Sequence, residues 1–90
     1  MAYRVEFTAR AAEEFRDLPK PVRKRIIRWL DLLAEDPRRP GTKQLEGRPE
    51  LRRVHAGKDY VIIYTILGRR FVVLVVRIAH RSEAYRGLPL

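Results

Sequence analysis

Residues 60–80, YVIIYTILGRRFVVLVVRIAH, form the most strongly patterned stretch of the chain. Tyr60–Ile66 is rich in β-branched and aromatic residues, which are typical of strands. Gly68-Arg69-Arg70 follows and predicts a turn, because glycine adopts backbone conformations that other residues avoid. Phe71–His80 then reads as a long apolar strand, expected to be central and covered on both faces. The stretch therefore predicts two long strands of one sheet.

Further strands are predicted on the N-terminal side of this stretch. Leu51–His55 is a short strand candidate, and Tyr3–Phe7 alternates apolar and polar residues as a half-buried strand does. The segment 36–42 is rich in proline and glycine and predicts a loop, and Lys43–Pro49 continues it as loop or as a short edge segment. The sequence therefore predicts a small sheet of four strands.

Two helices are predicted between the first two strands. Thr8 can cap a helix over Ala9–Leu18, and Pro21 suits the first turn of a second helix that runs to Ala34. The second helix carries apolar residues at spacings of three and four, which predicts one buried stripe: Val22, Ile26, Trp29, Leu30 and Leu33.

The element order β-α-α-β-β-β predicts an α+β fold over a single domain, residues 1–90. We expect the helical hairpin to pack on one face of a mainly antiparallel four-stranded sheet. Ser82–Leu88 is expected to be a short tail, with a helix as one option.

The composition favours an anionic partner. The 90 residues carry 20 Lys and Arg against 11 Asp and Glu, and the net charge of +9 is divided almost evenly between the two halves. A compact domain with this field attracts nucleic acid or an acidic protein. The chain has no cysteine and its N-terminus shows no apolar signal core, so we expect a cytoplasmic protein without disulfides or a membrane span.

Several basic, histidine and tyrosine residues are expected to converge on the sheet face that the helices leave open. If Val54 faces the helices, strand alternation turns its two neighbours to the opposite face. The candidate catalytic residues are Arg53, His55, His80, Arg81 and Tyr85. The candidate RNA-binding residues are Arg52, Lys58, Tyr60 and Arg77.

This set of residue types suits RNA cleavage without a metal ion. Arginine and lysine hold phosphate oxygens, and tyrosine and histidine stack on splayed bases. Arginine also stabilises the charge of a pentavalent phosphorane, and histidine transfers protons near neutral pH. Clustered carboxylates for Mg²⁺ are absent from the sequence pattern, and His55 and His80 do not have a zinc-binding spacing. We therefore expect neither a metal nor another cofactor.

Each candidate also has a purely structural interpretation. His55 and His80 can be hydrogen-bonded structural histidines, and Arg77 and Arg81 can pair with acidic residues such as Glu83. One of the strand tyrosines can pack in the core, and Tyr85 can pin the tail to the sheet. The functional reading depends on several of these groups sharing one face.

The chain resembles the RelE branch of the RelE/ParE toxin superfamily over nearly its whole length. The resemblance rests on the order and spacing of five segments: Tyr3–Thr8 with Ala11 and Ala12, Leu18–Lys20, Leu32–Arg38 with Gly41, Lys43, Leu45 and Gly47, Leu51–Tyr64, and His80–Tyr85. It implies a type II toxin that cleaves mRNA in the ribosomal A site and is neutralised by an antitoxin that wraps it in a hetero-oligomer.

The resemblance also implies roles for individual residues. Arg53 and His55 meet the positions that bind and orient RNA, and His80, Arg81 and Tyr85 meet those that contribute acid–base chemistry and stacking. The family's third-strand arginine is replaced by Val61. Two other functions therefore stay open: a ParE-like inhibitor of DNA gyrase, and a non-catalytic member that binds its antitoxin.

Overall fold

The computed structural model describes residues 2–88 and contains two α-helices, five strands and a short 3₁₀ turn. The helices are α1 (Ala9–Arg16) and α2 (Lys20–Glu35). The strands are β1 (Arg4–Phe7), β2 (Lys43–Leu45), β3 (Arg48–Ala56), β4 (Tyr60–Leu67) and β5 (Val72–His80), and the turn η1 (Gly68–Arg70) joins the last two.

The strands form one mixed sheet in the order β1-β5-β4-β3-β2. β1 runs parallel to β5, and every other neighbouring pair is antiparallel. The α+β class is confirmed, but the predicted strand count of four is wrong because β2 pairs with β3 along the sheet edge. A three-residue strand with no apolar alternation leaves too weak a pattern to be recognised in sequence.

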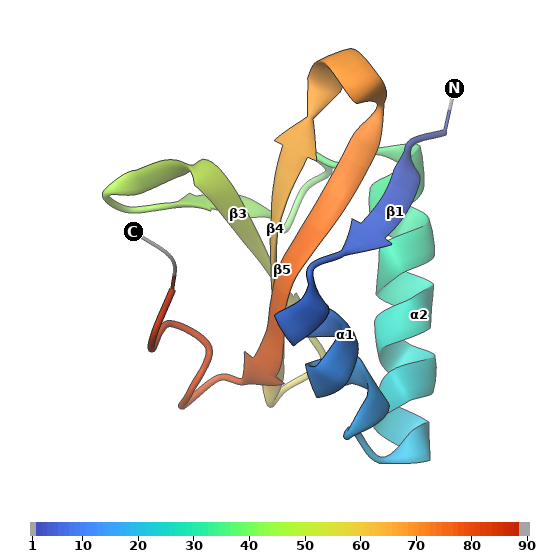
Figure 1. Ribbon diagram of the computed structural model, residues 1–90, viewed down its shortest axis with the longest axis vertical. Coiled ribbons are helices and arrows are strands. Elements are labelled where there is room, and N and C mark those ends of the chain that lie inside the picture. Colours follow the sequence, from blue (N-terminus) through green and yellow to red (C-terminus); the bar gives the residue numbers. More distant parts are fainter. Residues whose placement is uncertain (1, 89–90) are drawn as a thin grey trace.

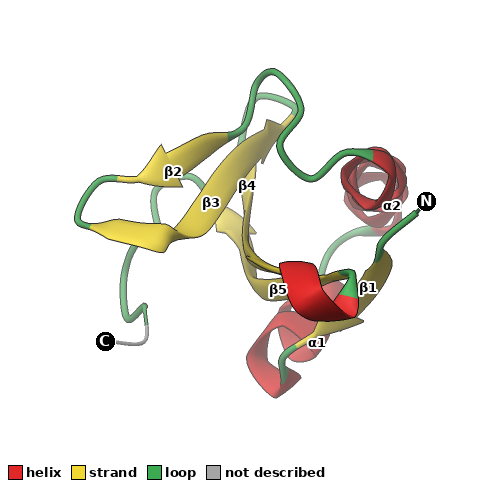
Figure 2. Ribbon diagram, turned by 90° about the horizontal axis from the view of Figure 1, so that it is seen from above, coloured by secondary structure: helices red, strands yellow, loops and turns green. Residues whose placement is uncertain are grey.

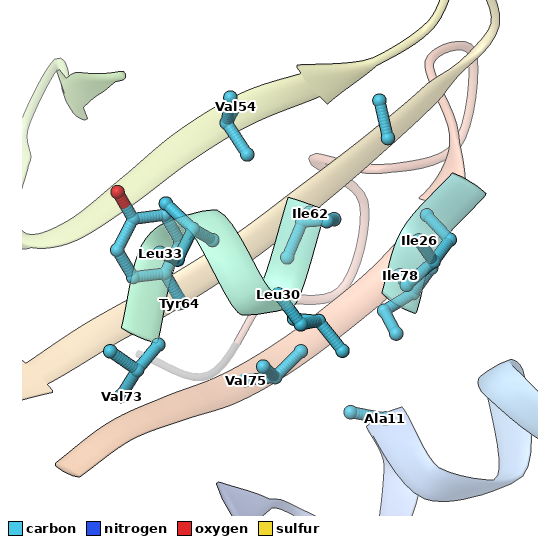
Figure 3. Packing of buried hydrophobic residues seen from close by; sticks show 11 residues of the cluster. Ala11, Ile26, Leu30, Leu33, Val54, Ile62, Tyr64, Val73, Val75 and Ile78 are labelled. Carbon is cyan, nitrogen blue, oxygen red and sulfur yellow. The ribbon is translucent and has the colours of Figure 1, made fainter. Parts of the chain in front are cut away.

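The two helices lie on one side of the sheet, and the C-terminal segment lies on the other (Figure 1). The view from above shows the same separation and places the β2–β3 hairpin away from α2 (Figure 2). Ile26, Leu30 and Leu33 of α2 are buried against the sheet, as the predicted stripe requires. Figure 3 shows these side chains beside Val54 and Ile62 of the neighbouring strands.

Local contacts explain where the helices begin. The Thr8 hydroxyl accepts a hydrogen bond from the Ala11 N–H at 3.2 Å, which caps α1 as predicted. Pro21 lies in the first turn of α2, where a missing N–H has no cost. α1 ends at Arg16, two residues earlier than predicted. In the tail, residues 81–87 form successive turns, and the possible helix is not formed there.

A second, smaller apolar cluster lies on the other face of the sheet, which we call the open face. Val61 and Ile63 of β4 and Ala84 of the tail are fully buried there. Leu45 of β2 and Leu51 of β3 are buried beside them. The tail therefore covers part of the face that the helices leave free. In residues 2–88, neither helix combines the length and the apolar character that a membrane span needs.

Candidate functional site

Strand alternation in β3 places Arg53 and His55 on the open face. Val54 and Ala56 belong to the core beneath the helices, whereas Leu51 belongs to the cluster on the open face. Side chains two residues apart share a face, so Arg53 and His55 point away from the helices. Arg53 is half-buried and His55 is exposed. The orientation predicted from Val54 is therefore the one observed.

A cleft of about 700 Å³ lies between the β2–β3 hairpin and the C-terminal tail. Arg53 of β3 and Tyr85 of the tail, whose side chain is half-exposed, both line it. We call this space the tail cleft. Its lining residues are Gln44, Leu45, Glu46, Arg48, Arg53, Tyr85, Gly87 and Leu88.

The tail cleft combines the groups that a sugar-phosphate chain requires. Arg53 is a planar cation that can hold a phosphate by two parallel hydrogen bonds, and Arg48 is a second cation whose Nε lies 3.5 Å from the Glu50 carboxylate. Tyr85 offers an aromatic surface that is 46% exposed and free to stack on a base. Glu46 is the one carboxylate among the lining residues. The cleft therefore has a mainly cationic and aromatic surface.

Sequence reasoning missed the part of the cleft that comes from the β2–β3 hairpin. Gln44, Glu46 and Arg48 line the cleft, but the segment around them was expected to be loop or edge. Gly47 has a φ of +77°, a conformation that favours glycine, and it makes the tight turn between the two strands. The Glu46-Gly47 pair was the available signal for this turn.

Lys58 and Arg81 lie together near another end of the open face. Lys58 is exposed in the turn between β3 and β4. The Arg81 N–H donates to the Asp59 carbonyl oxygen at 2.7 Å, which holds the first residue after β5 beside that turn. Both side chains are exposed, and neither is among the residues that line the tail cleft.

Tyr60 and His80 do not join the open face, so the predicted convergence is wrong for this pair. They are directly opposite each other in β4 and β5, and their rings are 5.8 Å apart in an edge-on arrangement. Tyr60 packs against the core beneath the helices, so the pair lies on the helix side. His80 follows Ile78 by two residues, and strand alternation gives both the same face. The His80 ring also contacts the Ser82 hydroxyl at 2.8 Å.

Arg52 is directed to the helix side as well, because it is one residue out of step with Arg53. It pairs with the buried Tyr64, and its Nη2 donates to the Thr42 hydroxyl at 2.8 Å. Arg52 therefore holds the loop before β2 and does not face the tail cleft.

Arg77 pairs in β5 with Ile63, which faces the open side of the sheet, but the Arg77 residue is buried and only 7% exposed. Its Nε donates to Glu14 at 3.0 Å, and its Nη1 donates to main-chain carbonyl oxygens of the tail. These contacts are all internal, and Arg77 is not among the residues that line the tail cleft.

Val61 occupies a closed position in the centre of the open face. It is fully buried and lies opposite His55 and Ala79 in the neighbouring strands. The cluster around it includes Ala84, which the tail lays over the sheet. A cation at this position would meet packed apolar side chains. In residues 2–88, no three histidine or acidic side chains come close enough to hold a metal ion.

The sequence matches the family model described as "ParE toxin of type II toxin-antitoxin system, parDE" over residues 5–85. It is 32% identical over 88 residues to the mRNA interferase toxin RelE of Escherichia coli K12, an alignment that covers 94% of this chain and 92% of that protein.

Solved structures show the same relationship. RelE in the archaeal RelE–RelB complex from Pyrococcus horikoshii superimposes with a TM-score of 0.76 at 28% identity, covering 93% of this chain and 100% of that one. The isolated E. coli RelE toxin gives 0.78 at 28% identity, covering 88% and 84% of the two chains. The chain therefore belongs to the ParE toxin family of type II toxin–antitoxin systems, and it is a RelE-type member.

Proposed function

We propose that this toxin is an endoribonuclease that cleaves mRNA on the ribosome without a catalytic metal ion. The observation that carries the proposal is the tail cleft, in which Arg53 and the Tyr85 ring line the same 700 Å³ space. The similarity to an mRNA interferase over nearly the whole chain supports the same reaction.

The cleft residues suit the chemical steps of metal-free RNA cleavage. The 2′-hydroxyl loses its proton and attacks the neighbouring phosphorus, and the bond to the 5′-oxygen breaks as that oxygen gains a proton. We assign Arg53 to the charge that accumulates on the phosphorane and Tyr85 to stacking on an adjacent base. His55 does not line the cleft, but it is exposed on the same sheet face as Arg53, two residues away in β3, so we assign it one of the proton transfers.

Arg81 and Lys58 are assigned to the RNA backbone outside the cleft. Both are exposed cations at the β3–β4 end of the sheet, where together they can hold phosphates of the chain beyond the cleft. The ribosome would present the mRNA in an extended single-stranded form. His80 is left out of the proposed site because it lies on the helix side.

We also propose a cognate antitoxin as partner. Two of the similar structures are complexes of RelE with RelB, which supports a toxin–antitoxin hetero-oligomer for this chain. A net charge of +9 favours a partner segment rich in acidic residues.

A ribosome assay tests the proposed activity. Purified protein is added to ribosomes with a defined codon in the A site and, separately, to the same mRNA alone. We expect cleavage within the A-site codon and a rate at least 100-fold lower on free mRNA, because the ribosome orders the substrate. Equal rates on both substrates would contradict ribosome dependence.

A sulfur substitution tests the role of metal. A phosphorothioate at the cleaved phosphate slows a metal-dependent reaction, and a thiophilic ion such as Cd²⁺ then restores the rate. We expect Cd²⁺ to give no recovery. Recovery of the rate would show that a metal ion contacts the reacting phosphate.

A non-catalytic toxin is the second candidate, and the buried Val61 favours it. In this case purified protein binds ribosomes and leaves the mRNA intact. The family model itself carries the ParE name, so a gyrase assay belongs beside the cleavage assay. Inhibited DNA supercoiling with normal translation would replace the nuclease proposal.

A further inference from the structure

Arg77 is a buried cation that the tail cleft does not use directly. It lies in β5, is 7% exposed, and pairs across the strand with Ile63 on the open face. Burying an arginine is unfavourable unless its charge and its donors are all matched. The groups that match its charge and its donors therefore show what the buried Arg77 holds together.

The contacts of Arg77 converge on the tail. Its Nη1 donates to the carbonyl oxygens of Glu83 at 2.6 Å and Ala84 at 3.3 Å, and also to that of Arg86. The two N–H bonds of this nitrogen therefore serve three carbonyls, two of which share a hydrogen, in a segment that has no regular secondary structure. Two of these carbonyls belong to the residues before Tyr85 and one to the residue after it.

Glu14 fixes the guanidinium from the other side. One carboxylate oxygen accepts from the Arg77 Nε at 3.0 Å, and the other accepts from the Ile78 N–H at 2.9 Å. β1 pairs with β5 only as far as Phe7 and Val75, so the edge of β5 is open at Ile78. Glu14 of α1 occupies this edge and links the helix, the strand and the tail.

A second contact from α1 reaches the same segment. Arg10 donates from Nη1 to the Gly87 carbonyl oxygen at 2.8 Å, and Ala84 is fully buried against the sheet. The tail is therefore held on both sides of Tyr85, the residue that lines the cleft together with Gly87 and Leu88.

We infer that Arg77 and Glu14 are positioning residues that hold the tail against the sheet and thereby keep Tyr85 in the cleft that Arg53 also lines. The effect on cleavage rests on the proposed function, but the effect on the tail does not. Figure 1 shows the tail crossing from the end of β5 to the side of the sheet away from the helices.

Amide hydrogen exchange tests the inference on the free protein. Arg77→Lys keeps the positive charge but loses the planar fork, and Arg69→Lys in the exposed turn η1 is the matched control. The amides of Ala84 and Arg86 are hydrogen-bonded within the tail. We expect their exchange to rise at least about tenfold in Arg77→Lys, with the amides of β4 unchanged, because charge-assisted hydrogen bonds to the tail are lost.

Glu14→Gln provides a second variant if Arg77→Lys folds poorly. It removes the charge that orients the guanidinium, and we expect a smaller rise confined to the same tail amides. Unchanged tail exchange in both variants would overturn the inference. An equal rise at tail and β4 amides would also overturn it, because Arg77 would then only stabilise the whole fold.

A double-mutant cycle on cleavage tests the link to Tyr85. If Arg77 acts through the Tyr85 ring, Arg77→Lys lowers the single-turnover cleavage rate about tenfold in the normal chain and less than twofold in a Tyr85→Ala chain. Equal effects in both chains would contradict this link. Absence of cleavage by the unchanged protein would remove the nuclease proposal, and the exchange result would still decide the tail contact.

Discussion

Arg52 and Arg53 are adjacent arginines with opposite positions in the structure. Arg53 lines the tail cleft on the open face, whereas Arg52 turns to the helix side and bonds the Thr42 hydroxyl. Strand alternation predicts that they differ, and the burial of Val54 in the helix-side core decides which of them faces the cleft. The same alternation places His80 on the helix side. The contacts that bury Arg77 come from Glu14 and the tail, which are distant from it or irregular, so no local pattern predicts them.

The arginine pair gives a matched test of the cleft. Arg53→Ala should lower ribosomal mRNA cleavage about 10²- to 10³-fold, as the loss of one transition-state donor does in other enzymes. Its free energy of unfolding should stay nearly unchanged. Arg52→Ala should leave the cleavage rate near normal and lower the free energy of unfolding by about 1 kcal/mol. Single-turnover cleavage and urea denaturation measure the two effects, and a reversed pattern contradicts the assignment.

A substitution at Val61 tests whether this fully buried position in the open-face cluster can accept a cation. Val61→Arg restores the residue type that the resemblance expects but inserts a cation among Leu51, Ile63 and Ala84. We expect the free energy of unfolding to fall by about 2 to 4 kcal/mol, because a buried charge lacks a partner there. Val61→Ile is the apolar control. A stable Val61→Arg protein with faster cleavage would show that this position is open to RNA.

At the scale of the elements, the cleft depends on two segments with weak sequence patterns. The long strands β4 and β5 and the stripe of α2 were predicted because apolar periodicity records burial directly. The strand β2 and the tail carry no such periodicity, and they are placed by contacts with residues distant in the sequence: β2 by pairing with β3, and the tail by Arg77 and Arg10. Such contacts cannot be deduced from local pattern, so half of the cleft wall was missed.

The N-cap of α1 supports the helix that supplies Arg10 and Glu14 to the tail contacts. The Thr8 hydroxyl caps α1 and also contacts the Val76 carbonyl oxygen at 3.4 Å. Thr8→Ala should lower the free energy of unfolding by about 1 kcal/mol, as loss of a helix cap does. Thr8→Ser keeps the hydroxyl and should stay near the unchanged chain. Thermal and urea denaturation measure both variants, and equal stability of the two would contradict the capping role.

At the scale of the molecule, the fold sets which parts of the positively charged surface are proposed to meet RNA. The net charge of +9 is spread through the fold, and the two faces of the sheet separate the structural core from the proposed RNA surface. The order and spacing of short segments predicted both the fold class and the family, because each segment corresponds to an element whose place the fold fixes. The proposed catalytic roles depend on which face of the sheet each side chain occupies, and the motifs alone do not determine that.

The charge predicts a salt-dependent association with RNA. The logarithm of the binding constant for a short single-stranded RNA should fall linearly with the logarithm of salt concentration. Lys58→Ala, at an exposed position outside the cleft, should reduce the slope by about one phosphate contact without loss of stability. Fluorescence anisotropy at several salt concentrations measures the slope. An unchanged slope would remove Lys58 from the RNA surface.

Primer extension on cellular mRNA after induction tests the central claim, that Arg53 and Tyr85 form one cleft that holds mRNA for cleavage. The account predicts new 5′ ends inside translated reading frames for the unchanged chain and for Arg52→Ala. It predicts almost none for Arg53→Ala or Tyr85→Ala at equal protein levels. Intact mRNA after induction of the unchanged chain, or full cleavage by both cleft variants, would contradict it.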